Sequence, residues 1–194
     1  MNENDTALRR AVLVVALLNL AYFGVEFWVA ISIKSVSLFA DSIDFLEDTS
    51  INLLIFFALA WSVRKKAKVG MALAAILLIP SVATLWAAWQ KLNFPAPPDP
   101  ILLSLTGLGA LIVNLSCAFI LARFKNHSGS LSKAAFLSAR NDALANVAII
   151  GAAVVTAVTM SPWPDLTVGI GIFIINLDAA REVYEEARKE HARA

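Results

Sequence analysis

Six apolar stretches, each long enough to cross a lipid bilayer as a helix, occupy most of this sequence. A transmembrane helix needs ~20 mostly apolar residues to cross ~30 Å of hydrocarbon. The runs are continuous and lack the alternation that marks a membrane β-strand. Hydrophobic residues make up 59% of the chain and charged residues only 16%. We expect an all-α integral membrane protein with six transmembrane helices. The predicted spans are Ala11–Ile33, Val36–Val63, Val69–Trp89, Ile101–Ala122, Leu131–Met160 and Pro162–Ala180.

The basic residues predict how these spans are oriented. Six spans place both termini on the same side of the membrane. Of the 16 Lys and Arg residues, only Lys34 and Lys91 then fall on the opposite side. Cytoplasmic loops carry the excess of basic residues, so we expect both termini in the cytoplasm. We expect the membrane to be a bacterial inner membrane. The basic residues mark membrane orientation, and we expect no nucleic-acid partner.

The chain is expected to form one domain. Residues 1–180 would be a six-helix transmembrane transport domain, and residues 181–194 a short charged cytoplasmic tail. Arg181 and Glu185 have the spacing of a helical ion pair in that tail. The single Cys117 lies inside a span, which excludes a disulfide framework. We predict no enzymatic activity, no catalytic residue and no resident cofactor.

Acidic residues inside the predicted spans are the most informative feature for function. Each costs ~2.5–3.5 kcal/mol in hydrocarbon, so such residues face the interior of a bundle and usually have a function. The second span has four acids within eight residues, and the spans contain almost no bases to pair with them. A bound cation, protons or water must compensate these charges. The residues are Glu26, Asp41, Asp44, Glu47, Asp48 and, in the fifth span, Asp142 followed one turn later by Asn146.

Helical geometry brings three of these carboxylates to a similar depth. Asp44 and Asp48 are four residues apart and share one face of the second span. They would lie ~12 Å and ~18 Å below one membrane surface, at ~1.5 Å per residue. Asp142 would lie ~16 Å below the same surface in a ~30 Å core. Converging carboxylates repel unless a divalent ion or protons neutralise them. We therefore expect the ion site of a transporter near the midplane.

At these residues the chain resembles the cation diffusion facilitator family. The second span reads Ser35-Val-Ser-Leu-Phe-Ala-Asp41-Ser-Ile-Asp44-Phe-Leu-Glu-Asp48. The family pattern there is Ala-Asp, then a His or Asp ligand, and an Asp ligand four residues later. Asp142 and Asn146 resemble the fifth-span pattern of Asp followed by Ser or Asn. The resemblance implies a metal/proton antiporter that expels Zn²⁺ or a similar divalent ion, usually as a dimer.

Two departures from the family pattern bear on the expected site and assembly. Ser138 stands where the family usually has His, so the fourth ligand is Ser138, Asn146 or water. The family's usual cytoplasmic metal-binding domain does not follow the sixth span in this sequence. We expect a short family member whose homodimer forms through membrane helices.

The sequence leaves the transported ion and two other functions open. The resemblance favours Zn²⁺ and Cd²⁺, whereas an all-oxygen site suits harder ions such as Mn²⁺, and Fe²⁺ also stays open. One alternative is a proton-coupled exporter of organic cations, which would favour an aromatic-lined pocket. The acids have few aromatic neighbours besides Phe45. The other alternative is a membrane subunit that assembles a complex without transporting anything.

Overall fold

The computed structural model describes residues 3–58, 82–124 and 130–176. Regular structure within these ranges is helical throughout, which confirms the predicted fold class. The labelled helices are α1 (Glu3–Ile33), α2 (Val36–Ala58), α4 (Pro100–Ala122) and α5 (Ser130–Thr159). Two further helical segments cover residues 82–93 and Trp163–Asn176. Most of the predicted third span, the end of the sixth span and the tail 181–194 lie outside the described residues.

The helix bounds agree closely with the predicted spans. α2 begins at the predicted residue, and α4 and α5 begin one residue early. α1 differs, because it begins at Glu3 rather than Ala11. The added residues include Arg9 and Arg10, so the helix continues beyond its apolar run as a polar extension.

Length and composition allow three of the described helical stretches to cross a membrane: Thr6–Ile33, Pro100–Ala122 and Ser138–Thr159. α2 does not qualify on composition because it contains four acids. Large apolar side chains point outward from the bundle, as lipid-facing residues do. Trp28, Phe119 and Val158 are 73%, 79% and 81% exposed.

Local sequence explains where these helices begin and reverse. Lys34 adopts a left-handed conformation (φ 54°) between α1 and α2. The Asp99 carboxylate accepts hydrogen bonds from the Ile101 and Leu102 amides at 2.9 Å, which caps the start of α4. Pro100 stands at the first helical position, where its missing N–H costs nothing.

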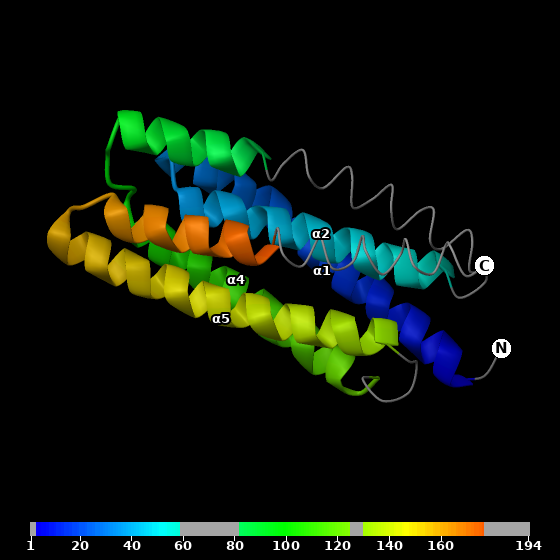
Figure 1. The fold of residues 1–194 in the computed structure, drawn as a ribbon. Coiled ribbons are helices and arrows are strands. Elements are labelled where there is room, and N and C mark those ends of the chain that lie inside the picture. Colours follow the sequence, from blue (N-terminus) through cyan, green and yellow to red (C-terminus); the bar gives the residue numbers. More distant parts are fainter. Residues whose placement is uncertain (1–2, 59–81, 125–129, 177–194) are drawn as a thin grey trace.

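The helices form a bundle in which α1 packs along α2 and α4 packs along α5 (Figure 1). α1 also contacts α4, and α2 contacts α5. The helix Trp163–Asn176, orange in Figure 1, runs in the same direction as α2. Asp165 near its start bonds to the start of α2, and Asn176 at its end bonds to Asp44 further along α2.

Gly169 allows this close approach. A Cβ at that position would lie 2.7 Å from the Val36 carbonyl carbon and 2.8 Å from the Ser37 nitrogen.

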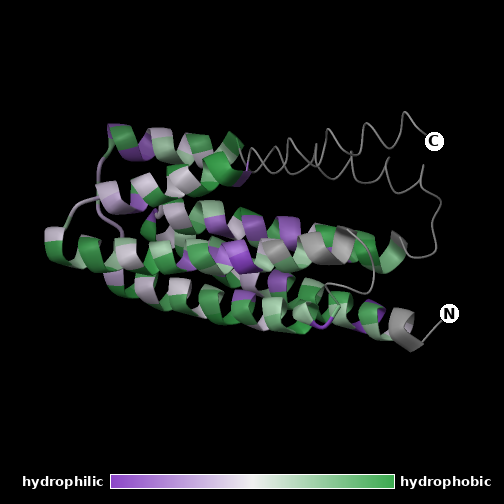
Figure 2. Ribbon diagram, turned by 60° about the horizontal axis from the view of Figure 1, so that its bottom comes forward, coloured by the Kyte–Doolittle hydropathy of each residue, from purple (hydrophilic) through white to green (hydrophobic). Residues whose placement is uncertain are grey.

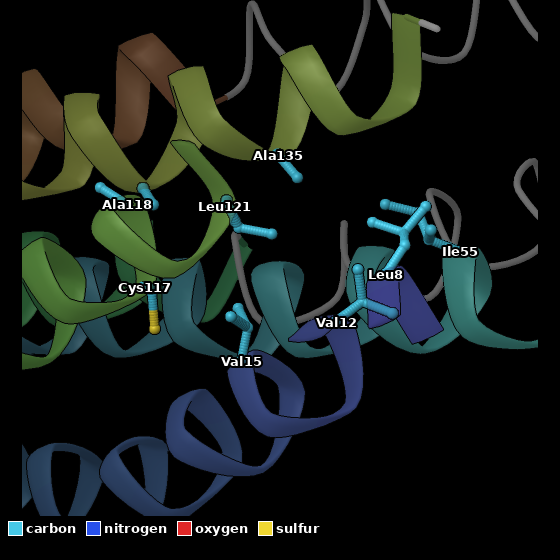
Figure 3. Close-up of a cluster of buried hydrophobic side chains, with 9 residues drawn as sticks. Leu8, Val12, Val15, Ile55, Cys117, Ala118, Leu121 and Ala135 are labelled. Carbon is cyan, nitrogen blue, oxygen red and sulfur yellow. The ribbon is translucent and has the colours of Figure 1, made fainter. Parts of the chain in front are cut away.

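The two larger buried apolar clusters occupy the two ends of the described bundle. The first, near the N-terminus, is drawn in Figure 3. The second joins residues such as Ala30, Leu38 and Leu103 at the other end. Hydrophobic residues predominate along the helices, and hydrophilic ones interrupt them near the middle (Figure 2). Between the clusters lies a set of buried polar residues, here called the polar layer. Its members are Asn19, Glu26, Asp41, Asp44, Asp48, Asn114 and Asn146.

Candidate metal centre

α2 supplies the acidic side of the polar layer. Asp41, Asp44 and Asp48 are 0%, 7% and 3% exposed. Because successive turns of a helix stack these side chains along one face, α2 presents them to α1, α5 and the helix Trp163–Asn176. Glu47 is less buried than these three.

Asp48 is held between α1 and α5. The Ser138 hydroxyl of α5 donates to Asp48 Oδ1 at 2.8 Å. The Asn19 amide of α1 donates to Asp48 Oδ2 at 3.4 Å. Both carboxylate oxygens therefore have a partner, and these bonds connect three helices at one point. Ser138, the residue that replaces the expected His, lies directly beside a predicted ligand.

Asp44 and Asp142 complete the group of three predicted carboxylate ligands. Asn176 donates from its side-chain amide to Asp44 Oδ1. Asp142 is half-buried on α5, and its carboxylate interacts electrostatically with those of Asp44 and Asp48. The three carboxylates therefore lie within electrostatic range of one another on α2 and α5, which contact each other.

Asn146 lies in a different part of the polar layer. Its amide nitrogen donates to Asp41 Oδ2, and its amide oxygen accepts from Asn114 Nδ2 at 2.9 Å. Both of its polar atoms are therefore engaged away from Asp44 and Asp48. Its role as a metal ligand stays a prediction, and the amide oxygen would have to leave Asn114 to bind an ion.

Glu26 and Asp41 form an adjoining carboxyl pair between α1 and α2. Glu26 is 0% exposed, and its carboxyl lies beside that of Asp41. No other described residue donates a hydrogen bond to either Glu26 oxygen or to Asp41 Oδ1. Two such carboxylates in a buried place repel unless a proton or a cation lies with them.

The described residues contain no group of three or more His, Cys, Asp or Glu side chains already gathered around one point as a metal shell. The hydrogen bonds give a physical reason. Asp48 is directed toward Ser138 and Asn19, while Asp44 is directed toward Asn176. A metal ion would have to replace these donors. His127 and His191 lie outside the described residues.

Asn176 is a site residue that the sequence reasoning missed. It ends a short apolar run, two residues before Asp178. From the sequence, a polar residue near the end of the sixth predicted span could not be expected to contact Asp44, 132 residues away in the chain. A helical-face comparison with Asp165, three turns earlier, could have drawn attention to it.

The comparison with known families decides the class of this protein. A family model described as the cation efflux transmembrane domain matches residues 12–190. The chain belongs to the cation efflux family. This cation efflux protein is therefore a multi-pass integral membrane protein and a cation transporter, and its family is not an enzyme class. A search of curated proteins finds no relative that matches the chain.

Proposed function

We propose that this cation efflux protein expels divalent metal ions by alternating access, with Asp44, Asp48 and Asp142 as carboxylate ligands. The observation that supports the proposal is that these three acids, from α2 and α5, lie close enough within the bundle to interact electrostatically. Buried acids without basic partners are suited to bind a cation reversibly. Apolar clusters on both sides of the polar layer suit an ion site near the midplane.

Metal binding exchanges one set of contacts for another. In the described conformation, hydroxyl and amide donors hold the carboxylates. An arriving ion takes the carboxylate oxygens and releases Asn176 and Asn19. Ser138 is the favoured fourth ligand, because its hydroxyl already lies 2.8 Å from Asp48 Oδ1. Asn146 or water are the alternatives.

Transport is coupled to protons as metal/proton antiport. Metal ions and protons compete for the same carboxylates, so loading one releases the other. The return of the empty site also requires its negative charge to be neutralised. We place both termini in the cytoplasm of a bacterial inner membrane, and we assign a homodimer formed through membrane helices.

Zn²⁺ is the first candidate for the transported ion, together with Cd²⁺. Mn²⁺ and Fe²⁺ follow, because carboxylate oxygen suits harder ions. The polar layer supplies carboxylate and amide groups, Ser138 beside it adds a hydroxyl, and the described residues place no His there.

Uptake by proteoliposomes that contain the pure protein tests this function. Liposomes loaded with a fluorescent metal indicator receive Zn²⁺, Cd²⁺ or Mn²⁺, and a parallel set receives a lipophilic organic cation. Metal entry above protein-free liposomes is expected, without entry of the organic cation. Organic-cation entry alone would support the rival exporter, and no entry of either would support a non-transporting subunit.

A further inference from the structure

A large cavity lies at the end of the bundle where α1 turns into α2, apart from the polar layer. Its volume is about 820 Å³. Its walls come from the end of α1, the start of α2, the helix 82–93 and the segment that follows it. Apolar walls include Ile31, Phe39 and Trp86, and polar positions include Lys34 and Gln90. This volume is within the range of ~300–1,000 Å³ typical of small-molecule sites.

The two lysines that line this cavity differ in whether an acid neutralises their charge. Lys91 is only 5% exposed, and its ammonium lies 3.5 Å from Asp165 and 2.6 Å from the Lys34 carbonyl oxygen. Asp165 therefore neutralises Lys91. Lys34 is exposed, and none of the described acids lies within ion-pair distance of its ammonium. Among the described residues, the cavity thus presents one uncompensated positive charge, that of Lys34.

The two lysines around the cavity are also the two basic residues that the predicted topology puts at this end of the molecule. Trp86 and Phe94, which line the same cavity, are 63% and 80% exposed. Aromatic side chains of this kind concentrate where lipid headgroups meet hydrocarbon. A lysine at that level can reach the phosphate of a lipid.

We propose that this cavity binds a phospholipid of the surrounding leaflet that has a net-negative headgroup, with its phosphate at Lys34 and an acyl chain along Ile31, Phe39 and Trp86. The single positive charge of Lys34 complements the single negative charge of such a headgroup. A zwitterionic lipid would bring its own cation near Lys34, which weakens the attraction. Gln90, exposed on the cavity wall, can donate to a phosphate oxygen.

The experiment compares phosphatidylglycerol with phosphatidylcholine of the same acyl chains. Native mass spectrometry of the full chain in detergent measures the apparent affinity for each lipid. One basic residue near a membrane surface is worth about fivefold in binding of anionic lipid, so we expect a preference of that size for phosphatidylglycerol. Lys34→Gln should abolish the preference, whereas Lys34→Arg should retain it.

Matched variants separate this site from general electrostatic attraction. Arg10→Gln removes an exposed charge at the opposite end and should leave the preference unchanged. Trp86→Ala should weaken both lipids by a similar factor, because it removes apolar wall and no charge. Thermal unfolding without added lipid verifies that each variant is folded. An equal affinity of the wild type for both lipids, or a preference that survives in Lys34→Gln, would overturn the proposal. Dimers that bind neither lipid would indicate that a second copy of the chain covers the cavity. This result would also overturn the proposal.

Discussion

At the scale of single residues, Asp44, Asp48 and Asp142 interact electrostatically across α2 and α5. Their role as metal ligands stays a prediction, but their similar depth could be estimated from the sequence. Helical spacing suffices for this, because rise and rotation per residue are constant. Asn146 shows that helical spacing does not predict the partners of a side chain. Its spacing from Asp142 is helical, but its partners, Asp41 and Asn114, come from helices whose packing no local pattern specifies.

Removing either of two carboxylates should stop transport. Asp48→Ala and Asp142→Ala are each expected to abolish Zn²⁺ flux while leaving a folded protein, because each removes a proposed ligand at a site with few others. Flux into proteoliposomes is the measurement. Asp99→Ala, which alters an acid outside the polar layer, is the control and should retain flux. Near-normal Zn²⁺ flux in either ligand variant would count decisively against the site.

Replacing Ser138 by His should change the metal preference. The Ser138 hydroxyl already contacts Asp48, so an imidazole at this position should reach an ion bound there. Imidazole suits Zn²⁺ and carboxylate suits Mn²⁺, so Zn²⁺ should tighten relative to Mn²⁺ by about tenfold. Titration of both ions in detergent, for wild type and Ser138→His, measures the ratio. An unchanged ratio in a folded variant would leave Asn146 or water as the fourth ligand.

At the scale of helices, the lengths of the apolar runs predicted the spans, and the structure shows which contacts hold the helices together. Asp165 makes the main contact between helices that the sequence did not predict. Its carboxylate accepts from the Ser35 and Ser37 hydroxyls and from the Val36 and Ser37 amides, at 2.6–3.2 Å. It thereby caps α2 from another helix 129 residues away in sequence. Capping patterns predict local caps only, which is why this one was missed.

Loss of the Asp165 charge should destabilise the bundle. Asp165→Asn leaves Lys91 buried without its partner, and breaking a buried pair in this way costs ~3–5 kcal/mol. Asp99→Ala removes an exposed cap and should cost ~1 kcal/mol. Thermal unfolding in detergent should show the larger fall for Asp165→Asn. Adding Lys91→Met to that variant should recover part of the loss, and no recovery would argue against the ion pair.

The contact at Gly169 can be tested with a paired glycine. Gly169→Ala would place a Cβ against the backbone at Val36 and Ser37, so the helix would have to move away from α2. Gly151→Ala meets nothing within 4 Å and should be neutral or slightly stabilising. We expect a lower unfolding temperature for Gly169→Ala alone. Equal unfolding temperatures for the two variants would mean that the helices are not this close.

At the scale of the whole molecule, the arrangement is a polar layer between two apolar clusters inside a lipid-facing shell. The order of the spans and the acids within them could be predicted because membrane insertion depends on local composition. The division into two apolar ends and one polar middle could not be predicted, because it depends on how α1 packs against α2 and α4 against α5. That arrangement suits an ion that enters from one side and leaves from the other.

The most direct test of this account records Zn²⁺ entry and internal pH together in proteoliposomes of the wild-type protein. Antiport predicts that the internal pH rises as Zn²⁺ enters, because protons leave in exchange. The rise should scale with Zn²⁺ flux and should be absent when Asp48→Ala replaces the wild type. Zn²⁺ entry without any proton counterflow, across a range of pH, would contradict the antiport mechanism. An absence of Zn²⁺ entry would contradict metal transport itself.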